Sequence, residues 1–328
     1  MPSANTYAAP STTGGNREDL RDILTILEPE GTPVTSMIQK GPSPQATLVE
    51  VLADTLRPAR TTGTPEGKDI NQFSNKSNKR QRFGNYIHIV TDTYAVTDVQ
   101  MHVATAGTND LYGEEKAKCL REIKRDLEAI VCGDQEMVAG NGDTGWVTRG
   151  LFKWIQSTAQ SLQPVPADFL TPAANIGAFG SGITEAQFNG ILQALFTVYG
   201  RKMTYQVPAG VDFINTVDNF MRVQPTSTNQ RYNIVDFGKE NTINLSVKVF
   251  DSSFGIANLI PDQFLKIDAN GLGAAAAALF LNMELLELQF MEPLHSVDKI
   301  DEGGGPRGYC KAMPSLCVKN PRGLGKNT

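Results

Sequence analysis

The apolar and polar positions between residues 109 and 132 repeat with the period of an α-helix. Large apolar residues recur there at three- and four-residue steps and share one stripe, which we expect to form a helix core: Leu120, Ile123, Leu127, Ile130 and Val131. Thr108 or Asn109 can cap the start, and Gly133 stands where a left-handed closing residue would end the helix. A helix of this length, about 36 Å, needs a broad surface such as a sheet to cover its apolar stripe.

Alternating segments on both sides of this helix predict that sheet. Residues 48–52 and 86–96 have the alternation and β-branched content of strands, the second returning beside the first. Near the end of the chain, residues 308–313 and 316–318 are also predicted to be extended. The segment 274–292 is long and largely apolar, and periodicity alone does not decide whether its five consecutive alanines form a helix or a packed strand.

Helix start and stop signals organise the rest of the chain. Residues 1–15 are small and polar, which predicts an arm, and Asn16 opens a short helix. Thr32 is placed to cap a further turn that Pro33 begins. Later predicted elements are a helix capped by Thr184 and Gln187 and ended by Gly200, a strand at 205–207, a helix at 211–221, a polar loop at 222–242, and a strand with Leu245, Val247 and Val249 whose hairpin turns at 251–255.

The polar stretch from residue 57 to 85 does not fit a compact monomer. Ile70 and Phe73 are its only large apolar residues before Phe83, and a basic run spans 76–82. A loop of this length with so little core is not expected to be ordered by its own chain. It is therefore either disordered or held by another molecule. The basic run is expected to meet an acidic neighbour or solvent rather than DNA, because no aromatic residues interrupt it.

Composition narrows the class of protein. The chain has 328 residues, 40% hydrophobic and 20% charged, which suits one large or two medium globular domains. Its 30 basic and 35 acidic residues give a net charge of −5, which argues against a main role in binding nucleic acid phosphates. No apolar run reaches the ~18 residues of a membrane span, and no signal peptide is evident. The spacing of the four cysteines favours buried, reduced thiols.

The sequence contains no catalytic motif with the neighbouring elements that its chemistry requires. Two G-x-G-x-x-G matches, at 140–145 and 303–308, lack the strand before and the helix after that a dinucleotide site needs, so we interpret them as turn glycines. His88 and His102 flank the predicted strand that leads into the long helix, and His295 lies far away without a nearby carboxylate pattern, so all three are interpreted as structural. We expect no catalytic, cofactor-binding or metal-binding residues.

The order of several segments resembles the major capsid proteins of tailed bacteriophages (Caudoviricetes), which have the Hong Kong 97 fold. The similar segments are 16–23 and 30–34 for the amino-terminal arm, 54–56 and 65–67 for the extended E-loop, 115–128 for the spine helix, 250–255 for the axial domain and 281–304 for the last peripheral-domain strand. Asn282 stands where an aspartate is expected, and 261–263 lacks a frequent basic residue.

The resemblance implies an α+β fold divided as in that family. The divisions are an N-terminal arm at 1–45, an E-loop at 46–96, a peripheral domain at 97–155 with the spine helix at 109–132, an axial domain at 156–270, and a peripheral return strand with the C-terminal tail at 271–328. The residues that it suggests for contacts between subunits are Arg17, Asp19, Arg21, Glu66, Lys68, Lys76, Lys79, Arg80 and Arg82.

The implied function is structural and not enzymatic. Pentamers and hexamers would assemble into an icosahedral virion shell that encloses double-stranded DNA without sequence-specific binding. Assembly is expected in the host cytoplasm, away from membranes and without a cofactor, with a separate scaffolding protein, a portal and a possible decoration protein. Lys76 and Lys79 are candidate donors for the isopeptide crosslink of some relatives, but no acceptor is evident and non-covalent contact is preferred. An encapsulin-like compartment for protein cargo and a soluble hydrolase are the alternatives.

Overall fold

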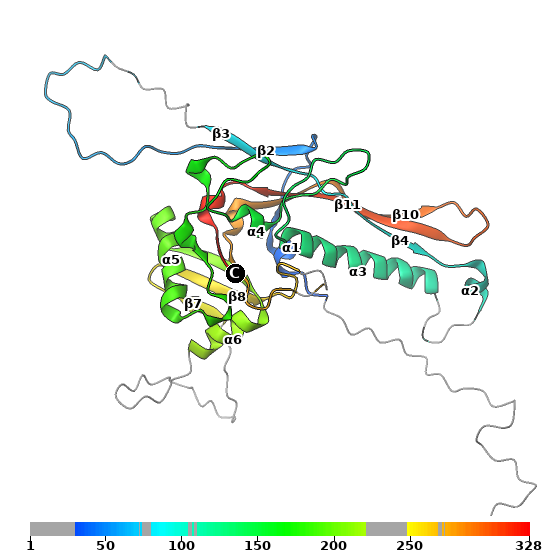
Figure 1. Cartoon of the computed structure of the whole chain (residues 1–328). Coiled ribbons are helices and arrows are strands. Elements are labelled where there is room, and N and C mark those ends of the chain that lie inside the picture. Colours follow the sequence, from blue (N-terminus) through cyan, green and yellow to red (C-terminus); the bar gives the residue numbers. More distant parts are fainter. Residues whose placement is uncertain are drawn as a thin grey trace, which may run out of the picture.

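The computed structural model describes residues 30–71, 73, 80–103, 107, 110–220, 248–267, 271 and 273–328. These residues form two larger sheets, a two-stranded ribbon and several helices (Figure 1). A long loop projects from one end of the body, and the tip of a long hairpin projects from the other (Figure 1). The expected mixture of helices and strands is confirmed.

The first sheet carries the longest described helix, α3 (Leu111–Val131). Its strand order is β1-β10-β11-β4, comprising β1 (Gln39–Lys40), β10 (Leu286–Lys299), β11 (Arg307–Val318) and β4 (Val90–Ala95). Strands β10 and β11 form the long antiparallel hairpin, and α3 lies along the sheet (Figure 1). Because the sheet covers the apolar stripe of α3, a long helix with a single apolar face is stable here.

The predicted stripe of α3 faces this sheet. Ile123 and Leu127 are buried against Val90 and Ala312, and Leu120 and Ile130 pack at the margin of the same core. Val131 is buried too, but in a neighbouring core that also contains Val34 and Phe83. The periodicity therefore identified the buried face of the helix correctly.

The ends of α3 differ from expectation. Thr108 and Asn109 lie outside the described residues, and the Asp110 side chain caps the helix by accepting from the Gly113 N–H at 3.0 Å. Gly133 is not left-handed. Instead Gln135 Nε2 donates to the Ile130 carbonyl at 2.5 Å, and a Cβ on Gly133 would collide with that amide. Glycine is thus needed for space, not for backbone conformation.

The expected strand 86–96 is wrong as a single element. Strand β3 (Gln81–Tyr86) pairs with β2 (Leu48–Ala53) in the ribbon, whereas β4 pairs with β11 in the first sheet. Between them, the Ile87 N–H donates to Thr47 and the His88 N–H to Pro314. The chain changes pairing partner at this point, which a continuous apolar pattern does not reveal.

The second sheet lies beside helices α5 (Glu185–Tyr199) and α6 (Val211–Phe220). Its strand order is β5-β12-β9-β6-β8-β7, comprising β5 (Ile176–Gly177), β12 (Gly325–Asn327), β9 (Ala278–Phe280), β6 (Met203–Ala209), β8 (Gly255–Pro261) and β7 (Val249–Asp251). Phe188 sits in the core between sheet and helices, in ring contact with Phe213 and Phe280.

Several predictions for this half are confirmed. Thr184 and Gln187 form the capping box of α5, and Gly200 closes it with a φ of 67°. The expected strand, helix and hairpin appear as β6, α6 and β7–β8. The loop 222–242 and the residues Leu245 and Val247 lie outside the described residues, as do residues 1–15 and Asn16.

The open choice at 274–292 is resolved as strand. The segment supplies β9 and the start of β10, joined by the short 3-10 turn η5 (Met283–Leu285). The Ala275 carbonyl accepts from Asp212 and Phe213 at the start of α6, so the alanines are held by tertiary backbone pairing. The remaining short elements are α1 (Pro33–Met37), α2 (Asp98–His102), α4 (Leu151–Trp154), η2 (Ala167–Phe169), η3 (Ala173–Asn175), η4 (Gly180–Gly182) and η6 (Pro321–Gly323).

Asn85 fastens the ribbon to the body. Its amide donates to the carbonyls of Arg149 (3.2 Å) and Leu316 (2.8 Å), and its Oδ1 accepts from the Arg149 N–H (2.8 Å), all within the interior. We expect Asn85→Ala to lower the free energy of unfolding by about 2–4 kcal/mol, because it leaves three buried backbone groups unpaired. Urea denaturation checks this, with Thr91→Ala on an exposed strand position as the control. A loss under about 0.5 kcal/mol, the range of ordinary surface changes, would refute this role.

Candidate assembly surfaces

The loop that follows β2 is the most unusual surface of the protein. From Leu56 to Asn71 every described residue is exposed, and the loop extends away from the body (Figure 1). Its large apolar side chains face solvent: Leu56 is 95% exposed, Ile70 76% and Phe73 89%. Apolar side chains gathered on a segment with no core of its own indicate a surface that another chain covers.

Ion pairs stiffen the base of this loop. Asp54 pairs with Arg80 at 3.1 Å, and Glu50 pairs with Arg82 at 3.5 Å across the β2–β3 ribbon. Both arginines are largely exposed, so each pair contributes little to stability on its own. They align the two ends of the loop where it leaves the body.

The predicted contact residues are spread over several places. Arg80 and Arg82 lie in and beside β3, and Glu66 and Lys68 lie on the exposed loop. Arg17, Asp19, Arg21, Lys76 and Lys79 are outside the described residues. The contact role of all of them stays a prediction.

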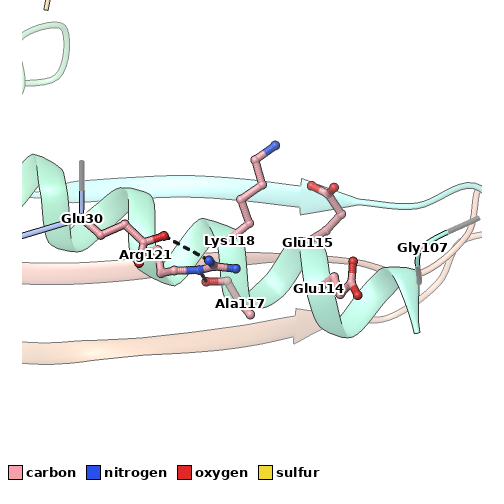
Figure 2. Close-up of a pocket in the computed structure, with 7 residues that line it drawn as sticks. All are labelled: Glu30, Gly107, Glu114, Glu115, Ala117, Lys118 and Arg121. Atoms are coloured by element: carbon pink, nitrogen blue, oxygen red, sulfur yellow. Dashed lines mark hydrogen bonds and ion pairs between the residues drawn. The ribbon is translucent and has the colours of Figure 1, made fainter. Parts of the chain in front are cut away.

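A shallow groove of about 410 Å³ runs over the outer face of α3 (Figure 2). Its lining consists of Glu30, Gly107, Glu114, Glu115, Ala117, Lys118 and Arg121. Arg121 donates to Glu30 at 3.2 Å, which holds the segment preceding α1 across the helix. The groove is open and bordered by charged side chains, unlike the enclosed apolar pockets that bind small molecules. It suits contact with another polypeptide.

The β10–β11 hairpin ends in an exposed tip. Ile300 is 88% exposed there, and the Asp301 carboxylate accepts from the N–H groups of Gly303, Gly304 and Gly305. These backbone hydrogen bonds hold the pKa of Asp301 below its usual range. The second glycine motif therefore forms a hairpin turn, and the first also lies in a turn, where Asn141 pairs with Thr144. Both were correctly interpreted as turn glycines.

A polar network connects this hairpin to α3. Asp298 accepts from Tyr94 (2.6 Å), Tyr112 (2.9 Å) and Lys116 (3.0 Å). The hydrogen bond from Tyr94 is the main cause that lowers the pKa of Asp298 to about 2, helped by those from Lys116 and Tyr112. The carboxylate therefore stays ionised and fully engaged, as suits a group that positions the hairpin.

His88 and the four cysteines have structural surroundings, whereas His295 Nε2 lies 3.4 Å from a carboxylate oxygen of Glu292, three residues earlier. Burial lowers the pKa of His88, and its Nδ1 accepts from the Thr148 N–H at 3.3 Å. Cys119, Cys132, Cys310 and Cys317 are buried free thiols, as expected. Among the described residues, no helix combines the length and apolarity that crossing a membrane requires.

The fold resembles that of shell proteins from phages and phage-like particles. The capsid protein of cyanophage P-SCSP1u superposes with a TM-score of 0.59 at 9% identity, covering 97% of this chain and 91% of the other. For cyanophage Pam1 the TM-score is 0.57 at 11% identity, with 97% of both chains covered. The capsid of the native GTA particle gives a TM-score of 0.57 at 10% identity, covering 95% of this chain and 94% of the other. These similarities show that the chain shares the fold of those shell proteins.

The family model for the SU10 major capsid protein matches residues 4–328. The chain belongs to the SU10 major capsid protein family. Among curated proteins none matches the sequence. Members of the family are structural components of the particle and not enzymes.

Proposed function

We propose that this capsid protein forms pentamers and hexamers that close into an icosahedral shell around double-stranded DNA. The observation that carries the proposal is the projecting loop, with Leu56, Ile70 and Phe73 exposed. Burying each of these side chains against a neighbour would contribute about 1.5–3 kcal/mol. Repeated around a closed ring, such contacts make a stable assembly from individually reversible steps.

The elements take the following roles in this proposal. The loop between β2 and β3 is the E-loop, lying over the adjacent subunit, and the segment before α1 is the end of an arm that reaches another neighbour. Helix α3 with the first sheet forms the peripheral domain, and the second sheet with α5 and α6 forms the axial domain. Because β9 and β12 belong to the second sheet, the axial domain also takes 278–280 and 325–327, beyond the expected limit at 270.

The proposed partners follow from assembly and filling of such a shell. A separate scaffolding protein would guide assembly in the host cytoplasm, a portal would occupy one vertex, and a decoration protein is an optional addition to the outside. The net charge of −5 suits an inner surface that does not grip DNA, so that the genome can be pumped in and ejected. An encapsulin-like shell would share the subunit contacts but hold protein.

Sedimentation velocity of the purified chain, with electron microscopy of the main species, tests the proposal. We expect rings, tubes or closed shells, either alone or after co-expression with a scaffolding protein. A 35.6 kDa monomer that persists at high concentration and with scaffold present would contradict it. Particles from infected or lysogenic cells should contain DNA, whereas a protein cargo without DNA would favour the encapsulin-like alternative.

A further inference from the structure

Three potential metal ligands meet in the interior where α1, α3 and the end of β8 come together. Glu128 and Cys132 lie one turn apart on α3, so their side chains share a face of the helix. Asp262 follows β8 directly. All three are buried, with exposed fractions of 0%, 0% and 4%. One ligand atom from each lies within 4.8 Å of the others, and Cys132 Sγ is 3.8 Å from Asp262 Oδ2.

Backbone donors hold the two carboxylates in position. Glu128 accepts from Val34 N–H at 2.6 Å and from Thr35 N–H at 2.8 Å, and so caps α1 in place of the expected Thr32 side chain. Asp262 Oδ1 accepts from Phe264 N–H at 2.9 Å. An ionised carboxylate has about four lone-pair sites. Each group therefore keeps acceptor capacity after these bonds are made.

The cluster brings two buried carboxyl groups and a buried thiol together. Among the ion pairs that the described residues form with one another, none involves Glu128 or Asp262. Arg125, on the same helix, places its guanidinium 5.8 Å from the centre of the Phe264 ring. Buried carboxylates in proteins are normally paired with a cation or coordinate a metal.

We propose that Glu128, Cys132 and Asp262 bind one divalent cation of the Zn²⁺ type. A thiolate with carboxylate oxygens favours Zn²⁺ or Co²⁺ over Mg²⁺ and Ca²⁺, which prefer oxygen alone. Zinc bonds to sulfur and oxygen at tetrahedral angles put those atoms about 3.6 Å apart, close to the observed 3.8 Å. Binding would release the Cys132 thiol proton to solvent.

A hollow beside the cluster is lined by one of the three ligands, Asp262, and also by Arg125. It measures about 190 Å³, and Gly210 and Gly273 line it too. A water entering there can fill a fourth coordination position. The bound cation would link three elements. These are α3, the start of α1 through the hydrogen bonds of Glu128, and the second sheet through Asp262. It would thus fix the start of α1 relative to both sheets. This role goes beyond the proposed shell function and does not depend on it.

Metal titration of the full chain tests the site. After treatment with a chelator, Co²⁺ should bind at one equivalent per chain and give a sulfur-to-cobalt charge-transfer band, and Zn²⁺ should displace it. Cys132→Ala should abolish the band and weaken binding at least about tenfold, since even the loss of an outer-sphere partner costs 10–100-fold. Cys317→Ala removes a buried thiol on β11 and should leave metal binding unchanged.

Asp262→Asn provides a second measurement in case Cys132→Ala folds poorly. This variant keeps the thiol, so the charge-transfer band should remain while the affinity falls. In the wild type, excess Zn²⁺ should raise the melting temperature, as any ligand does that binds only the folded state. Absence of Co²⁺ binding by the wild type, or equal binding by Cys132→Ala, would overturn the proposal and show that protons neutralise the cluster.

Discussion

Replacing residues 57–79 with a short Asn-Gly turn is expected to leave a folded monomer that no longer assembles. The ribbon should survive, because β2 and β3 keep their full register and Asp54 stays next to Arg80. Phe83, which is buried against Trp154 and Phe169, is also retained. The variant loses Ile70 and Phe73, the two exposed apolar side chains within the replaced segment, and with them proposed contacts of about 1.5–3 kcal/mol each at every subunit junction.

Thermal melting and sedimentation velocity together distinguish this outcome from misfolding. The melting temperature of the variant should match that of the wild-type monomer, while rings and shells disappear at all concentrations tested. Ile70→Ser is a graded version, expected to raise the concentration needed for assembly at least about tenfold, since 1.4 kcal/mol corresponds to that factor. Asn71→Ser, in the same loop, should assemble normally. Wild-type assembly by the truncated chain would exclude the loop as a contact between subunits.

Local patterns predicted the elements whose stability is itself local. The stripe of α3 follows from its helical period, and the capping box at Thr184 uses contacts within one turn. The change of partner between β3 and β4 depends on strands far along the chain, since β4 pairs with β11. The same reason explains why 274–292 stayed undecided, because the Ala275 carbonyl is paired with the start of α6, more than 60 residues earlier in the chain.

The sites divide in the same way. An exposed loop could be expected from the polar stretch after residue 57, because the sequence itself shows that this stretch has too few apolar residues to form a core. The buried cluster was missed, although Glu128 and Cys132 stand at helical spacing. Their partner Asp262 lies 130 residues beyond Cys132 and reaches them only through packing of the second sheet. A glutamate next to Leu127 on the buried face of α3 was the available signal.

Arg149→Met is expected to destabilise the monomer strongly. The Arg149 side chain is fully buried, donates to Glu136 at 2.6 Å and lies 4.7 Å from the centre of the Trp154 ring. It also donates to the Leu162 carbonyl, and its burial lowers the pKa of the guanidinium. Removing the guanidinium leaves the Glu136 carboxylate without its ion-pair partner, a change that costs about 3–5 kcal/mol for a buried pair. Glu136 is 21% exposed, which places the expected loss near the lower limit.

A double-mutant cycle separates charge from packing at this pair. Urea denaturation of Arg149→Met, Glu136→Gln and the combined variant should show the double variant to be more stable than Arg149→Met alone, because no unpaired carboxylate remains. If the two single losses simply add, Glu136 is sufficiently hydrated and Arg149 acts through its stacking on Trp154. A loss below about 1 kcal/mol for Arg149→Met would exclude both explanations. Since Arg149 also holds Asn85 through its backbone, whose bonds survive the substitution, the ribbon should stay attached in every variant that folds.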